Sequence, residues 1–554
     1  MADTNYSSPI MAYMASTTLC AMHAPPLHLQ APADKFVAVA PFLLPPVQSL
    51  SHSNLFSSWT WHWAYLVYAL LLWQITYILH TFWWKAPTGV IIAAHPTVLG
   101  RYFTALQMIF DSETLLQRAY DSSNGQPFAI PMTDRWIVYV SDHAQLKTLE
   151  SEPETVLSME QALHELAFTG PILGHLQVKP EHKGPKSEGF RVMIGVLKNK
   201  LRSNIPVMSA AFRKSIEDAF TKEVEDSKKN EDGWSEILMM PSLLRVFTRV
   251  NLLAFLGEDQ AGEIKVYDDI MSFFWSCAKA FPIVNLMPQF TMPLISPIAM
   301  GFGITRRVVY NLILRLTSKS VHGTATNKMH ITHWVAEVTK LHDIAAIARI
   351  TLGLLFASAF QVPMIAQFVI YRLCIHPEYT AQLRAEAESF DDAAFTAKNE
   401  EMPYLDSFIK ETSRLSPGPI LSAPRAVMHD YTTSSGAYVP RGNWLAIPQI
   451  ALMRDEAIWT GGAAFDGFRF VSNTGNASDS RWTHPSYEYP FWGSIRHACP
   501  ARFYVSVVMK MILGHILKEY EFKLRDEGAR PCLTFGKVRL PSPFMVLLVK
   551  KRTV

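Results

Sequence analysis

The sequence has few cysteines and few charged residues, and both shortages limit what the protein can be. The 554 residues include five cysteines, and no two of them have CxxC spacing. This argues against a disulfide framework and against a zinc site, and it favours a reducing compartment. Charged residues make up only 18% of the chain, the net charge is +3, and no tract of Lys and Arg is present. A nucleic-acid partner is therefore not expected. The cysteines are Cys20, Cys277, Cys374, Cys499 and Cys532.

One long segment has no charge at all. Residues 59–84 read WTWHWAYLVYALLLWQITYILHTFWW, with no Lys, Arg, Asp or Glu in 26 positions. This is long enough to cross a bilayer as a helix, and tryptophans lie at both ends, as in an interfacial belt. A buried core helix could also be this apolar, but would rarely carry six tryptophans. We therefore predict a transmembrane helix over 59–84.

The flanking residues orient this helix. Lys85 and Arg101 follow it, whereas Lys35 is the only Lys or Arg before it. The positive-inside tendency then places the bulk of the chain in the cytosol. Residues 1–58 contain two Pro-Pro pairs and no helical periodicity, so we expect a disordered tail, with a targeting element as the weaker alternative.

The rest of the chain, 85–554, predicts one globular domain that is mainly α with a minor β-sheet region, an α+β class. Helical patterns cover 193–202, 207–224, 234–256, 264–281, 304–316 and 340–374, with Pro206 separating the first two. Alternating apolar residues predict a strand pair in 128–142, two strands joined by a Ser-Ser-Gly turn in 426–448, and a final pair near 533–551. No internal repeat or long linker is visible.

The most informative segment is WGSIRHACPARF, 492–503, just before an apolar helical pattern. A thiolate at Cys499 would face backbone N–H groups and the positive end of the helix dipole, which lower a cysteine pKa. A buried structural cysteine is the plainer interpretation. The segment, however, resembles the haem-binding loop of the cytochrome P450 family, FGxGRHxCPG. The resemblance implies that Cys499 is the axial ligand of a haem iron.

The loop departs from the family pattern at three positions. Trp492 stands where Phe is usual, Ala501 replaces the last Gly, and Ile495 stands where a second Gly is usual. A glycine can take a positive φ and lets the backbone approach a porphyrin closely, whereas a β-branched residue does neither without cost. We expect the Ile495 change to alter the loop.

An acid and a base three residues apart, Glu411 and Arg414, precede RLSPGP. That spacing allows an ion pair on one helix but is common by itself. Its distance from Cys499 resembles that of the ExxR pair of the same family, which an Arg from a later loop closes into a triad. FDGFRF, 465–470, supplies Arg469 for this role. The resemblance implies that the triad braces the haem loop, and losing one partner would leave a buried charge unpaired.

Three further cations match positions that contact haem or its surroundings in the family. Arg425 in LSAPRAV and His497 resemble residues that meet the haem propionates, and Arg496 matches the motif beside them. Cationic donors suit two buried carboxylates; surface charges are the alternative for Arg425 and His497. VLKNKLRSNIP, 196–206, resembles a helix on the opposite edge of the haem, where Lys198 or Arg202 could face the porphyrin or a redox partner.

The helix over the haem departs most from the family. LLFASAFQVPMIAQFVIYRLCIHPEY resembles the fungal FAAIHTTS…HPEY segment, with the register fixed by HPEY at His376. Phe360 then occupies the acid or His position and Gln361 the Thr position of the proton relay. Phe360 cannot pass protons, whereas Gln361 could hold a water. Pro363 predicts a kink, which suits either an opening over a cofactor or a bend for packing. We expect Phe356, Phe360, Gln361 and Ile420 to line the pocket.

Together these motifs resemble fungal cytochrome P450 enzymes of secondary metabolism. The resemblance implies a P450 fold behind a single-pass anchor in the endoplasmic reticulum membrane, haem b as the cofactor, and electrons from NADPH through NADPH-cytochrome P450 reductase. The expected reaction is hydroxylation of a lipophilic terpenoid or polyketide intermediate. The alternatives are a member that desaturates, couples or rearranges its substrate, and a haem-binding protein without turnover.

Overall fold

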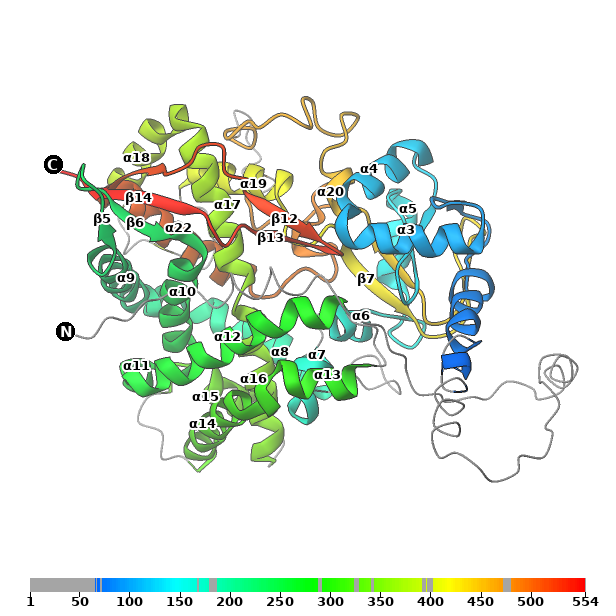
Figure 1. Cartoon of the computed structure of the whole chain (residues 1–554). Coiled ribbons are helices and arrows are strands. Elements are labelled where there is room, and N and C mark those ends of the chain that lie inside the picture. Colours follow the sequence, from blue (N-terminus) through cyan, green and yellow to red (C-terminus); the bar gives the residue numbers. More distant parts are fainter. Residues whose placement is uncertain are drawn as a thin grey trace, which may run out of the picture.

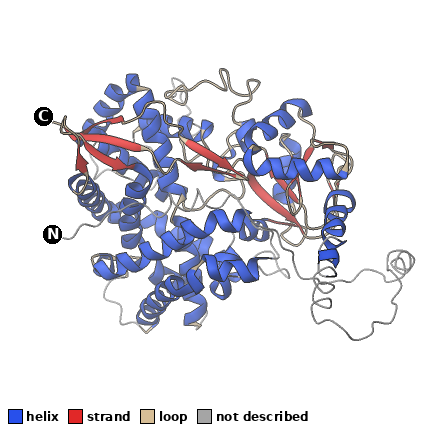
Figure 2. Ribbon diagram, viewed as in Figure 1, coloured by secondary structure: helices blue, strands red, loops and turns tan. Residues whose placement is uncertain are grey.

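A computed structural model describes residues 65, 67–69, 72–166, 169–178, 187–286, 291–322, 328–339, 343–390, 395, 402–471 and 480–553. Helices make up most of it, and the strands form a few short ribbons (Figure 2). The mainly α class with a minor sheet region is therefore confirmed. The predicted tail, 1–58, lies outside the described residues.

A six-stranded sheet with its helices forms one end of the molecule (Figure 1). Its strand order is β1-β2-β3-β10-β7-β4, with β2 and β3 forming the hairpin predicted in 128–142. Apolar side chains of the sheet enter two core clusters. The strands are β1 (Ile91–Ile92), β2 (Phe128–Pro131), β3 (Trp136–Tyr139), β10 (Trp444–Ile447), β7 (Ser422–Val427) and β4 (Leu157–Ser158). The helices at this end are α3 (Val98–Phe110), α4 (Ser112–Ser123), α5 (His143–Ser151), α6 (Met159–Leu166) and α20 (Gln449–Leu452).

The larger, helical part is built around one extensive apolar cluster. It comprises α7 (Thr169–Leu173), α8 (Glu188–Gly195), α9 (Arg202–Glu225), α10 (Met239–Leu256), α11 (Glu258–Ala261), α12 (Ile264–Leu286), α13 (Met292–Ala299), α14 (Ile304–Val321), α15 (Ile331–Val338), α16 (Ile344–Ser358), α17 (Gln361–Ile375), α18 (Thr380–Ser389), α19 (Pro403–Leu415) and α22 (Arg502–Glu519). Short helices are η3 (His80–Trp84), η4 (Gly174–Leu176), η5 (Val196–Leu201), η7 (Gly301–Gly303), η8 (Pro377–Tyr379) and η10 (Pro490–Trp492).

Three smaller ribbons complete the fold. A four-stranded sheet has the order β11-β14-β6-β5, and the pairs β12–β13 and β8–β9 stand apart from it. The Ser-Ser-Gly turn joins β8 to β9, as the sequence predicts, while β7 and β10 lie outside that ribbon. The strands are β5 (Lys228–Lys229), β6 (Ser235–Leu238), β8 (Tyr431–Thr432), β9 (Tyr438–Val439), β11 (Tyr520–Leu524), β12 (Cys532–Phe535), β13 (Val538–Pro541) and β14 (Val546–Lys551).

Three helix predictions were wrong in their boundaries. The pattern at 234–256 begins with a strand, because Ser235–Leu238 pairs with β14 before α10 starts. Pro206 lies inside α9 rather than between helices. Proline has no backbone N–H to donate. Pro206 lies in the first turns of α9, just after the π-helical turn η5, where the regular hydrogen-bond pattern of the helix already changes. The pattern at 340–374 divides into α16 and α17 at Ala359 and Phe360.

Part of the predicted transmembrane helix is described, and its last turns dock on the sheet. Residues 72–79 are helical and continue into η3. The Tyr77 hydroxyl donates to the Thr133 carbonyl at 2.7 Å, and Trp136 Nε1 donates to the Thr81 carbonyl at 2.9 Å. Tyr65 and Trp83 are about 60% exposed, so apolar surface remains uncovered. Within the described residues, Met239–Leu256 and Ile344–Ile375 are also long and apolar enough to span, but most of each is buried inside the protein.

Candidate haem-binding site

The loop before α22 holds Cys499 at the point where that helix begins. Trp492 ends the short helix η10, and Gly493 follows with φ of +96°. The backbone N–H of Cys499 donates to the Trp492 carbonyl at 2.7 Å and closes the loop. A Cβ on Gly493 would lie 3.0 Å from the His497 carbonyl oxygen, so both the positive φ and the close approach require glycine.

Cys499 is a free thiol in a largely apolar setting. Burial raises its pKa, while the N–H groups of Ala501 and Arg502 and the Arg502 guanidinium lower it, and burial has the larger effect. The donors expected from the sequence are present, but the net shift has the opposite sign to the expected one. A cation bound to the sulfur would favour the thiolate and offset the effect of burial on this pKa.

Ile495 does not strain the loop. Among the described residues other than glycine, a positive φ occurs only at Asn124, Phe302, Met402 and Ala423, so Ile495 has an ordinary backbone conformation. Its side chain is 47% exposed. The left-handed position of the loop is Gly493, and the effect of Ile495 on haem binding stays a prediction.

The predicted triad is formed. Arg414 makes a bidentate pair with Glu411, with Nε to Oε2 at 2.7 Å and Nη2 to Oε1 at 2.8 Å, and both side chains are fully buried. Arg469 Nε lies 3.1 Å from each Glu411 oxygen. The two arginines also donate to backbone carbonyls, including Gly462 from Arg414 and Thr460 from Arg469. The Glu411 carboxylate is thus compensated by two arginines, and the remaining donors of these arginines are taken up by backbone carbonyls.

Arg425 and His497 meet beside the loop. Arg425 Nη2 donates to His497 Nδ1 at 3.0 Å, and the arginine is 2% exposed. Its Nη1 is buried and has no hydrogen-bond partner. Burial lowers the pKa of Arg425 to about 10, although Glu154 and Glu150 act against this. A buried guanidinium with an unused donor fits a carboxylate ligand such as a haem propionate.

Arg496 contacts Glu150 through its backbone, and its expected role in haem binding stays a prediction. Its side chain is exposed, whereas its backbone N–H donates to Glu150 Oε1 at 3.0 Å. Of the two basic residues considered on the opposite edge, Lys198 is exposed. The Arg202 guanidinium lies over the Phe503 ring at 3.7 Å, close to the start of α22.

The helix break lies where the sequence places the oxygen-activating residues. Pro363 cannot donate to the Ala359 carbonyl, and the helix ends at Ser358 and restarts at Gln361. Phe360 packs against the Phe274 ring at 5.9 Å, and Gln361 is exposed at the head of α17.

The side of α16 one turn earlier is open. Ala357 is exposed, and a Cβ on Gly353 would meet no atom within 4 Å. Both positions therefore border open space. Of the other expected pocket residues, Phe356 is half-buried against the core and Ile420 is fully buried in the core of the sheet.

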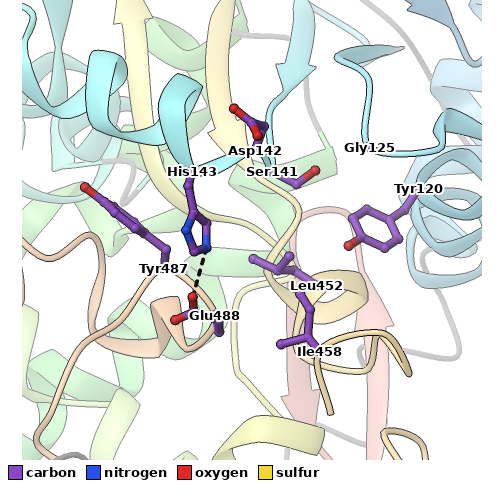
Figure 3. A pocket seen from close by; sticks show the side chains of 9 residues that line it. All are labelled: Tyr120, Gly125, Ser141, Asp142, His143, Leu452, Ile458, Tyr487 and Glu488. Atoms are coloured by element: carbon purple, nitrogen blue, oxygen red, sulfur yellow. Dashed lines mark ion pairs between the residues drawn. The ribbon is translucent and has the colours of Figure 1, made fainter. Parts of the chain in front are cut away.

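A separate hollow of about 280 Å³ lies on the surface near the residues that lead into the loop (Figure 3). Its wall includes an ion pair in which His143 Nε2 lies 2.8 Å from Glu488 Oε1. Tyr487, which also lines it, donates its hydroxyl to Glu150 Oε2 at 2.9 Å. None of the residues expected to bind haem lines this hollow.

Two residues beside the loop were missed from the sequence. Ser422 Oγ donates to the Pro490 carbonyl at 2.6 Å, and Glu150 holds Arg496 and Tyr487. Each contact joins segments at least 68 residues apart. No motif in the sequence signals them.

Comparisons with known proteins agree with this geometry. The sequence profile of the family "Cytochrome P450" matches residues 212–548, more than half of the chain. The chain belongs to the cytochrome P450 family, and it is a monooxygenase of that family.

The relatives are fungal. "Cytochrome P450 monooxygenase olcJ" of Penicillium canescens is 27% identical, over 65% of this chain and 70% of that protein. "Cytochrome P450 monooxygenase atmQ" of Aspergillus flavus is 23% identical, over 89% of this chain and 94% of that protein. "Ent-kaurene oxidase" of Gibberella intermedia is 24% identical, with the same coverage of 89% and 94%.

Solved structures share the fold. The heme domain of cytochrome P450DA superposes with a TM-score of 0.63 at 15% identity, covering 84% of this chain and 98% of that one. Retinoic acid-bound cyanobacterial CYP120A1 gives 0.61 at 14% identity, covering 81% and 96%. The predicted P450 fold is confirmed, and the family and fold imply haem as the cofactor.

Proposed function

We propose that the protein is a haem-thiolate monooxygenase in which the Cys499 sulfur would bind the haem iron. The observation that carries the proposal is one juxtaposition beside the loop. Cys499 and His497 belong to a closed loop at the start of α22, and Arg425 reaches the same loop with a buried, unused Nη1. Haem matches all three residues, because its iron takes a thiolate ligand and its propionates take cationic donors.

Each residue has a distinct task in this proposal. Cys499 supplies the sulfur ligand, Arg425 and His497 hold the propionates, and the Glu411 triad braces the backbone around them. The bound haem supplies oxygen activation, through which one oxygen atom enters the substrate and the other leaves as water. Gln361 holds a water that delivers protons to the open side of α16, and Phe360 keeps the neighbouring wall dry.

The proposed substrate class is supported by the proteins to which this chain is similar. Its relatives are fungal monooxygenases, and one is named an ent-kaurene oxidase. We infer a lipophilic terpenoid or polyketide intermediate as substrate. An NADPH-cytochrome P450 reductase would supply the two electrons.

The proposed location is the endoplasmic reticulum membrane, with 59–84 as a single span and the catalytic domain, 85–554, in the cytosol. The described end of this segment supports it, because Ile75, Trp83 and Trp84 are each more than half exposed. Large exposed apolar side chains on one helix suit a lipid surface.

Turnover tests the proposal. The purified full chain is combined with reductase, NADPH and extracts of pathway intermediates, and products heavier by one oxygen are sought by mass spectrometry with ¹⁸O₂. We expect ¹⁸O in the product of the wild-type protein and none with Cys499→Ser. Equal ¹⁸O incorporation by the two proteins would contradict the proposal.

A second reaction type is favoured by one observation. The aromatic Phe360 stands where the family relay has a proton-passing side chain, and it is packed against Phe274. A member that rearranges its substrate without reducing dioxygen needs no proton delivery, whereas one that desaturates or couples its substrate still reduces dioxygen to water and needs protons for that. In the same assay all three would change the substrate without adding ¹⁸O, but only desaturation or coupling would consume NADPH.

A further inference from the structure

Glu150 is a buried carboxylate beside the proposed haem loop. It lies in the last turn of α5, where Leu146 and Leu149 are buried against the sheet and carry Glu150 inward. Its side chain is largely removed from water, with the residue 6% exposed. Burying a carboxylate is costly unless donors compensate it.

Its two donors come from both sides of the loop. The Tyr487 hydroxyl donates to Oε2 at 2.9 Å, and the Arg496 N–H donates to Oε1 at 3.0 Å. Tyr487 precedes the short helix that leads into the loop, and Arg496 lies three residues before Cys499. One side chain therefore connects the approach to the loop with the loop itself.

Among the described residues, no charged group contacts the Glu150 carboxylate directly. Both of its hydrogen-bond donors are neutral groups, and it forms no ion pair within 4.0 Å in the part of the chain that the structure describes. The charged form of Arg425 is favoured by Glu154 and, less strongly, by Glu150. A buried charge is screened far less than one at the surface. The charge of Glu150 would therefore also act on a haem bound beside Arg425.

We propose that Glu150 is a positioning residue of the haem loop whose negative charge also favours the ferric form of the bound haem. This inference rests on the proposed function. Its two hydrogen bonds fix the Tyr487 and Arg496 ends of the loop, and Arg425 is left free to turn Nη1 to a propionate. Because reduction adds one negative charge at the iron, a nearby fixed negative charge opposes it.

The test compares reduction potentials of full-length, haem-loaded variants. Glu150→Gln keeps the shape and an acceptor oxygen but removes the charge, so the potential should rise. At a fixed applied potential the ratio of ferrous to ferric haem should increase several-fold, on the order of threefold to tenfold. Tyr487→Phe removes one hydrogen bond and keeps the charge, so it should speed haem loss and leave the potential unchanged.

A matched control lies on α18. Glu386 also accepts two hydrogen bonds from neutral donors, here the backbone N–H groups of Tyr404 and Leu405 at 2.8 Å each, at the start of α19. Glu386→Gln should leave the potential at the wild-type value. An unshifted potential in Glu150→Gln, or an equal shift in Glu386→Gln, would overturn the inference.

Two outcomes remain to be separated. If Glu150→Gln does not retain haem, Glu150→Asp takes its place: an unchanged potential with faster haem loss supports the inference, and a raised potential overturns it. If the wild-type protein shows no thiolate-type spectrum with carbon monoxide, the proposed function itself fails. If the wild-type protein shows that spectrum but Glu150→Gln leaves the reduction potential unchanged, only the proposed role of Glu150 fails.

Discussion

The two sides of the proposed haem site have diverged to different degrees from the family pattern. On the side of Cys499, the polar contacts expected from the motifs are formed: the Glu411 triad is complete, and Arg425 meets His497. At the break between α16 and α17, Phe360 and Gln361 stand at the positions where the family resemblance places the proton-relay residues. The contacts proposed to hold the haem are therefore formed, while the residues proposed for proton delivery differ from the family pattern.

This difference separates two physical demands. Holding a buried, charged group requires that every neighbouring charge be satisfied, so one lost partner costs several kcal/mol. The open side has to admit a substrate and a few protons, and many arrangements can do this. Changes at the first side should therefore affect stability and haem retention, and changes at the second should affect product yield.

The largest effect is expected from Glu411→Gln. It leaves Arg414 and Arg469 without their shared buried carboxylate, which should lower the free energy of unfolding by about 3–5 kcal/mol and release haem. Urea titration followed by circular dichroism, with haem absorbance in parallel, measures both. Glu388→Gln, which breaks a half-exposed pair with Arg552, is the control and should cost less than about 1 kcal/mol. Similar losses in both variants would contradict the triad's role.

Gly493→Ala should come next. The alanine must adopt φ near +96° with its Cβ 3.0 Å from a carbonyl oxygen, which costs on the order of 1–3 kcal/mol. We expect a lower melting temperature and weaker haem binding. Gly195→Ala, inside α8 with no atom within 4 Å of the new Cβ, is the comparison and should not destabilise. An unchanged melting temperature in Gly493→Ala would mean that the loop can adjust to the added Cβ, and would contradict the need for glycine at this position.

On the open side, Gln361→Ala should leave folding and haem content unchanged and lower coupling. The expected loss is several-fold in product formed per NADPH consumed, with more peroxide released, since the amide that orders the relay water is gone. Product and peroxide are quantified together. Unchanged coupling would remove Gln361 from the relay.

The smallest effect is expected from Ile495→Gly. The isoleucine is 47% exposed with an ordinary φ, so its loss should change the free energy of unfolding by less than about 1 kcal/mol. The haem spectrum should be unaltered. A marked gain in haem affinity would show that Ile495 does hold the loop away from the porphyrin.

The sequence predicted most of the holding side because those residues lie in short motifs with fixed spacing. Glu411 and Arg414 share one helix face, and His497 lies two residues from Cys499, so local geometry brings each pair together. The mainly helical class and the hairpin at 128–142 followed from periodicity in the same way.

What escaped prediction depends on contacts between distant segments. Glu150 reaches Arg496 across 346 residues, and Ser235–Leu238 becomes a strand only because β14 pairs with it. The net pKa direction of Cys499 depends on burial, which a local motif does not encode. Pro363 predicted a kink in this helix, but not where the helix would break. The break lies at Ala359, four residues earlier, because the Ala359 carbonyl is the one to which Pro363 cannot donate a hydrogen bond.

The carbon monoxide difference spectrum of the reduced, purified protein tests the central claim most directly. Thiolate ligation by Cys499 predicts the long-wavelength Soret band specific to that ligand, and its loss in Cys499→Ser. A wild-type band of the nitrogen-ligated type, or the same thiolate band in both proteins, would contradict the account.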